Sequence, residues 1–154
     1  MRDWIEERAA KIRAEERGRQ RESDWQVHEA QVIKANGPVI LDRLFKTVVR
    51  DIRKFNAHFP NDPSRRIQRA ERTTSGGFLV HHTHFPTVTL EVSLSADQLE
   101  YVYTKTPNAQ SLPFQIRGRF SLGLSESGEI YIHQDSKLLS YELASQILLE
   151  PIFS

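Results

Sequence analysis

The hydrophobic pattern of residues 3–35 predicts a helix whose middle has no apolar face. Apolar side chains recur at helical spacing near its start, at Trp4, Ile5, Ala9 and Ile12, and near its end, at Trp25, Val32 and Ile33. Between them, residues 13–24 contain Ala14 as their only apolar side chain. Such a helix is marginally stable alone, and Gly18 costs it about 1 kcal/mol relative to alanine. We therefore expect residues 1–24 to form a charged helical arm, which docks through Trp4, Ile5 and Ile12 on its own domain or on a second subunit.

A second helix is predicted from Pro38 to about His58. The segment Asn36-Gly37-Pro38 is expected to end the first helix and begin the second, because glycine is favoured just after a helix and proline at the start of one. The second helix has the best-defined apolar face of the chain, at Leu41, Leu44, Phe45, Val48, Val49, Ile52 and Phe55. A face this broad must be buried in a folded domain.

From Arg66 onward the hydrophobic period changes from about 3.6 to 2, which indicates strands. The clearest alternation lies in residues 87–95, 114–124 and 129–133, and weaker strands are expected at 67–72, 78–85 and 99–104. Short connections force neighbouring strands to be antiparallel, so we predict a meander of five to six strands. Ser140 then caps a last helix, Tyr141 to Glu150, packed on one face of the sheet. The prediction is an α+β domain over residues 25–154.

Composition narrows the function classes. The chain has 154 residues, 38% of them hydrophobic and 27% charged, which suits one globular domain. It has no cysteine, which excludes disulfides, thiolate nucleophiles and cysteine-ligated metals. With no apolar run long enough for a signal peptide or a membrane span, we expect a cytoplasmic protein that does not contact membranes.

Charge is uneven along the chain. Residues 1–72 carry 17 Lys and Arg against 12 Asp and Glu, whereas residues 73–154 carry 4 against 8. Opposite net charge on the two halves favours binding of a charged partner or self-association in which unlike surfaces meet. Surface charge also varies along a chain without any functional reason, so the asymmetry fits that alternative equally well.

Two groups of cations are candidates for binding nucleic acid or another anion. The basic stripe consists of Arg43, Lys46, Arg50 and Arg53, which recur at helical spacing beside the buried face. Such a helix edge can place cations at intervals along a phosphate backbone, but a solvated helix face has the same pattern. The second group is Arg117, Arg119, Tyr131 and His133, on strands expected to be hairpin neighbours with one exposed face. Arginines beside aromatic rings can stack on bases, and they suit a peptide or subunit contact equally well.

The cluster His81-His82-Thr83-His84 is the other conspicuous feature. On a strand His82 and His84 share a face and His81 points to the other. Two histidines do not make a metal site without a third ligand, so no metal is predicted. Together with Tyr101 and Tyr103, His82 and His84 are candidates for lining a small-molecule pocket between helix and sheet.

The sequence contains no nucleophile elbow or glycine-rich phosphate loop, and no cofactor is predicted. The function expected first is therefore a non-enzymatic interaction domain that self-associates and has a possible protein partner. A nucleic-acid- or anion-binding module is the alternative, and a small-molecule pocket the second alternative.

Overall fold

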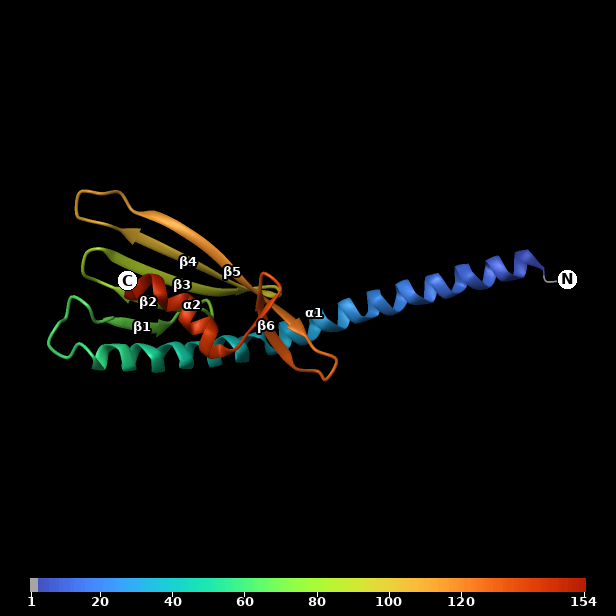
Figure 1. Ribbon diagram of the computed structural model, residues 1–154, viewed down its shortest axis with the longest axis horizontal. Coiled ribbons are helices and arrows are strands. Elements are labelled where there is room, and N and C mark those ends of the chain that lie inside the picture. The colour runs from blue at the N-terminus through green and yellow to red at the C-terminus, as the bar shows by residue number, and fades with distance from the viewer. Residues whose placement is uncertain (1–2) are drawn as a thin grey trace.

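The computed structural model describes residues 3–154 and has the α+β fold that the sequence predicts. Its elements follow the order α1 (Trp4–Ala57), β1 (Arg69–Arg72), β2 (Phe78–His82), β3 (Thr87–Ser95), β4 (Gln98–Thr106), β5 (Phe114–Leu124), β6 (Ile130–Gln134), β7 (Lys137–Leu139) and α2 (Tyr141–Phe153). One half of α1 lies along the sheet and the other extends far beyond it (Figure 1). In the described part of the chain no helix is long and apolar enough to cross a membrane.

The seven strands form one antiparallel sheet in the order β1 to β7, so every strand pairs with its neighbour in sequence. This is the predicted meander, with one strand more than the five to six expected. The added strand is β7, which has only three residues. In the turn before it Asp135 and Ser136 both have positive φ, as in the tight two-residue turns of hairpins. Because the turn lacks glycine and asparagine, the sequence signals it only weakly.

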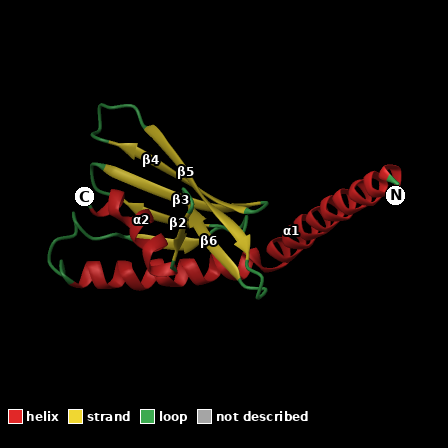
Figure 2. Ribbon diagram, turned by 45° about the vertical axis from the view of Figure 1, so that its right-hand side comes forward, coloured by secondary structure: helices red, strands yellow, loops and turns green. Residues whose placement is uncertain are grey.

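The predicted break at Asn36-Gly37-Pro38 is wrong, because α1 runs through it without interruption. Pro38 removes one backbone hydrogen bond, and the helix bends where it leaves the sheet instead of ending (Figure 2). Gly37 serves packing: a Cβ atom there would lie 2.7 Å from Cδ2 of Leu94 on β3. The glycine therefore lets the helix approach the sheet closely, and buried residues on both sides of the segment hold the helix in one piece.

Both helices pack on one face of the sheet, and the core lies between them and it. The predicted apolar face of α1 is buried at Leu41, Leu44, Val48 and Ile52 and half-buried at Phe45, Val49 and Phe55. Aromatic rings join the layers: Phe45 contacts Phe78 of β2 at 5.3 Å between ring centres, and Phe55 stacks on Phe153 of α2 at 3.9 Å.

The helix α2 begins at its predicted N-cap, where Ser140 Oγ accepts a hydrogen bond from the Leu143 backbone N–H (3.1 Å). It continues to Phe153 instead of ending near Glu150, with Pro151 inside it. Proline has no N–H for the carbonyl four residues earlier, that of Ile147. The Tyr103 hydroxyl of β4 lies 3.4 Å from this carbonyl oxygen and donates to the Leu148 carbonyl at 2.6 Å, which ties α2 to the sheet.

Candidate functional site

The N-terminal half of α1 projects away from the sheet (Figure 1). Asp3 caps the helix, its Oδ1 accepting from the Ile5 backbone N–H at 2.9 Å. No residue from Asp3 to Val32 is buried, and Ile33 is the first that is. At the tip Trp4 is 73% exposed and Ile5 58%. Trp25, the first residue of the predicted domain, is 40% exposed.

A single stripe of side chains connects this exposed segment to the core. Positions alternately four and three residues apart lie along one side of a helix. Starting at Ile5, they are Ile5, Ala9, Ile12, Glu16, Arg19, Ser23, Gln26, Ala30, Ile33, Gly37, Ile40 and Leu44, which we call the α1 stripe. The last four are buried against the sheet. The exposed part is thus apolar at both ends and polar in the middle, as the sequence indicates. The sequence does not predict that the same stripe continues past Gly37 to Leu44, because the helix is expected to end at that glycine.

A groove lies where the projecting segment of α1 meets the sheet, a position that we call the root of the segment. It has a volume of about 730 Å³ and an apolar floor formed by Ala30 and Ile33 of α1, Leu94 of β3, and Ala96 in the β3–β4 turn. The groove is also lined by three charged residues, Glu29, Lys34 and Asp97. Sequence reasoning could not find this groove, because it depends on the β3–β4 turn lying beside α1.

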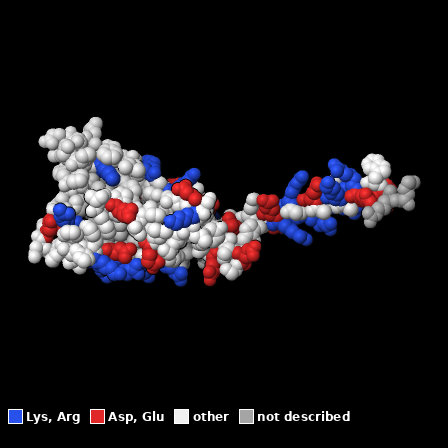
Figure 3. All heavy atoms as spheres, viewed as in Figure 1, with Lys and Arg blue, Asp and Glu red and all other residues white. Residues whose placement is uncertain are grey.

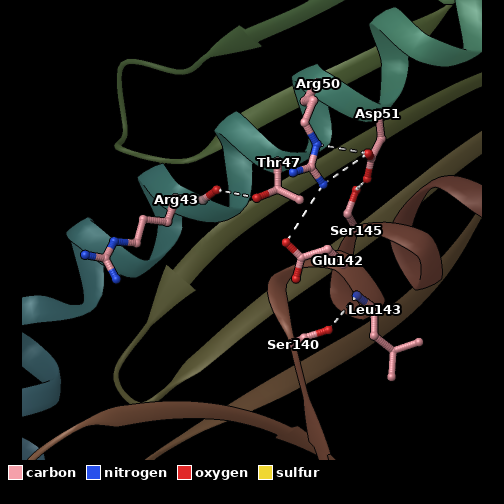
Figure 4. Close-up of polar contacts among 8 residues, drawn as sticks. All are labelled: Arg43, Thr47, Arg50, Asp51, Ser140, Glu142, Leu143 and Ser145. Atoms are coloured by element: carbon pink, nitrogen blue, oxygen red, sulfur yellow. Dashed lines mark hydrogen bonds and ion pairs between the residues drawn. The ribbon is translucent and has the colours of Figure 1, made fainter.

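The basic stripe lies exposed along α1, but part of its charge is neutralised within the chain. Lys46 Nζ is 3.0 Å from Asp42 Oδ2, and its hydrogen bond is the main reason that the pKa of Asp42 is lowered. Arg50 is 3.4 Å from Asp51 and 3.9 Å from Glu142 of α2 (Figure 4). In the described part of the chain Arg43 and Arg53 form no ion pair. Figure 3 shows cations gathered along this edge, with acidic groups among them.

The second cationic group shares one face of the sheet, as predicted. The face opposite the helices carries Arg117 and Arg119 on β5 and Tyr131 and His133 on β6, with His133 paired to Ser121. The Tyr131 and His133 rings lie 5.4 Å apart, and the Tyr131 ring occupies the space that a Cβ atom at Gly123 would need. The group is therefore brought together, on the side of the molecule that no helix covers.

The four candidate pocket residues lie mainly in the core. His82, Tyr101 and Tyr103 are buried, and hydrogen bonds within the chain satisfy their polar atoms. The two ring nitrogens of His82 face carbonyl oxygens, Nε2 that of Ser64 at 2.7 Å and Nδ1 that of Pro86 at 3.3 Å. The Tyr101 hydroxyl accepts from Gln134 Nε2 at 2.8 Å. His84 lies beyond the end of β2, its ring centre 6.3 Å from that of His82. These contacts are those of packed structural residues.

His81 points to the opposite face from His82, as predicted, and its Nδ1 contacts the Thr89 hydroxyl of β3. Its pKa is lowered, mainly by desolvation and also by the charge of Arg69. Among residues 3–154 no three histidine or carboxylate side chains converge on a point that could hold a metal ion.

Comparisons with protein-family models, with curated proteins and with solved structures find no significant match to this chain.

Proposed function

We propose that this protein is a non-enzymatic interaction domain that self-associates through the projecting half of α1. The observation that carries the proposal is the exposure of this segment, from Trp4 to Val32, with apolar side chains at its tip. An isolated helix of this kind has no tertiary packing to stabilise it, and helices that are polar on all sides are marginal in water. A partner that covers the α1 stripe would supply the missing packing.

The charges of the stripe favour an antiparallel pair of α1 helices. In a parallel pair identical positions face each other, so Glu16 would meet Glu16 and Arg19 would meet Arg19. In an antiparallel pair with Ile5 facing Ala30 of the second copy, Ile12 faces Ser23 and Glu16 faces Arg19. The central charges then attract instead of repelling.

The groove at the root of α1 supports the same arrangement. In the antiparallel pair the tip of each helix, with Trp4 and Ile5, reaches the root of the other. There the floor of Ala30, Ile33 and Leu94 offers apolar surface to it. Two identical contacts related by a twofold axis result, which is the commonest symmetry of soluble homo-oligomers.

Light scattering at several protein concentrations tests the proposal. We expect the full chain to have the mass of a dimer. Ile5→Glu combined with Ile12→Glu at the tip, or Ala30→Glu at the root, should each give monomers, because either places a carboxylate in an apolar contact. Leu138→Glu is the matched control: Leu138 is an exposed apolar residue of β7, away from the stripe. A monomeric wild-type chain, or variants with unchanged mass, would contradict the proposal.

Charge exchange at the centre gives a second test. Glu16→Arg or Arg19→Glu alone places like charges opposite each other and should weaken the dimer. The double variant Glu16→Arg with Arg19→Glu restores opposite charges and should recover the dimer. Failure of the double variant to recover it would argue against this register.

A further inference from the structure

The strand β5 has an open edge along more than half of its length. On one side β4 pairs with Phe114 to Ser121. On the other side β6 pairs only with Ser121 to Leu124. Residues 114–120 therefore form a sheet edge within the described chain, although β5 lies between two strands in the topology. In Figure 2 the β4–β5 hairpin extends away from the helices, and β6 lies near its opposite end.

The register shows which backbone groups this edge presents. The Leu122 N–H donates to the Asp97 carbonyl at 2.8 Å, on the β4 side. Alternate residues of an antiparallel strand direct their N–H and C=O groups to opposite sides. Gln115, Arg117 and Arg119 consequently face the open edge. Consistent with this, Gln134 Nε2 donates to the Arg119 carbonyl at 3.0 Å. In the described chain the N–H and C=O groups of Gln115 and Arg117 have no partner on this edge.

The side chains along the edge differ sharply between its two faces. On the helix side Phe114 is 47% exposed and Ile116 46% exposed, because the hairpin extends past α2. On the other side lie the guanidinium groups of Arg117 and Arg119, and within residues 3–154 neither forms an ion pair. Arg117 Nη2 donates only to the neighbouring Gln115 Oε1, at 3.0 Å.

We propose that this edge binds an extended segment of another protein in which acidic residues alternate with apolar ones. The segment would add a strand to the sheet beside β5, with main-chain hydrogen bonds to Gln115 and Arg117. Because side chains alternate along a strand, its apolar residues would pack beside Phe114 and Ile116 while its carboxylates face Arg117 and Arg119. A second copy of β5 fits poorly, since antiparallel self-pairing brings the arginines of both copies onto one face.

The probe for this proposal is a short fluorescein-labelled peptide in which glutamate alternates with valine, titrated with the full chain and followed by fluorescence anisotropy. A peptide in which lysine replaces glutamate is the control ligand. We expect saturable binding of the acidic peptide, at least about tenfold tighter than of the basic one, because carboxylates pair with the arginines. Arg117→Glu with Arg119→Glu should reverse this preference.

The contribution of the backbone is tested separately. Gln115→Pro removes an N–H that faces the open edge and leaves the bonds to β4 intact, so it should weaken binding of the acidic peptide about tenfold. Gln115→Ala keeps the N–H and should bind like wild type. If the proline variant fails to fold by circular dichroism, N-methylation of alternate peptide amides makes the same test. Absence of binding, equal binding of the two peptides, or binding unaffected by removal of main-chain donors would overturn the proposal. None of these results depends on whether the protein is a dimer.

Discussion

Tyr103→Phe removes one hydroxyl group from the core and leaves the ring in place. The hydroxyl donates to the Leu148 carbonyl of α2 at 2.6 Å and lies 3.4 Å from that of Ile147. Pro151 cannot donate to the Ile147 carbonyl, so the tyrosine is the nearby donor that compensates for it. A buried hydrogen bond contributes about 1 kcal/mol net, and an acceptor left unpaired adds to the loss. We expect the variant to be less stable by about 1.5 kcal/mol near neutral pH.

The difference should depend on pH, because burial raises the pKa of Tyr103 above its ordinary value of 10.0. Above about pH 10 the unfolded chain loses the tyrosine proton while the folded chain keeps it. Folding stability from this group is therefore fully present below pH 10 and falls as the pH rises, by up to about 1.4 kcal/mol per pH unit. Phenylalanine does not titrate. The stability difference between wild type and variant should thus shrink to near zero at about pH 11.

Urea unfolding of both proteins at several pH values measures this difference directly. Tyr131→Phe is the control, because Tyr131 lies exposed on the opposite face of the sheet and its replacement should change stability by less than about 0.5 kcal/mol. A stability difference between wild type and Tyr103→Phe that stays constant from pH 8 to pH 11 would refute the reasoning, as would equal stability of the two at neutral pH.

Two further substitutions test the packing. Gly77→Ala should lower stability by more than about 2 kcal/mol and the melting temperature by several degrees, because the alanine Cβ atom would lie 2.2 Å from the Val92 carbonyl oxygen of β3. The control is Gly18→Ala. Its methyl group contacts nothing within 4 Å, so it should not lower the melting temperature. Ser145→Ala removes the hydrogen bond between the helices that the Ser145 hydroxyl donates to Asp51 Oδ2 (2.7 Å). The free energy of unfolding in urea should fall by about 1.5 kcal/mol. An unchanged urea midpoint would show that this bond does not hold α2 on α1.

The fold class follows from the sequence because the period of the hydrophobic pattern changes once, from helical to alternating. The predictions that were wrong concern positions where tertiary contacts, and not the local sequence, determine the structure. Glycine and proline at positions 37 and 38 resemble a helix end, yet the glycine fits against Leu94 and the helix continues. The turn at Asp135 and Ser136 has serine where glycine usually follows aspartate, so the sequence gives only a weak signal for β7.

The candidate sites divide in the same way. That Arg117, Arg119, Tyr131 and His133 share a face follows from alternation along strands and was predictable. The open edge of β5 could not be predicted. It arises because β6 pairs with only part of β5, and this depends on the register of the two strands. Histidines and tyrosines on half-apolar strands could line a pocket or fill a core, and only the observed hydrogen bonds of His82 and Tyr103 distinguish the two. The self-association predicted from Trp4, Ile5 and Ile12 stays a prediction.

The most direct test of the proposed assembly measures distances between identical spin labels in the two copies. The chain has no cysteine, so Ala10→Cys, Arg17→Cys and Asp24→Cys each introduce one labelling site, all on the same side of α1 away from the stripe. In the antiparallel pair the two labels are offset along the helix axis by about 2 Å at position 17 and by about 20 Å at positions 10 and 24. We therefore predict the shortest distance at position 17 and longer distances on both sides of it. Equal distances at the three positions would indicate a parallel pair, and the absence of any measurable distance would indicate a monomer; either result would contradict the proposed assembly.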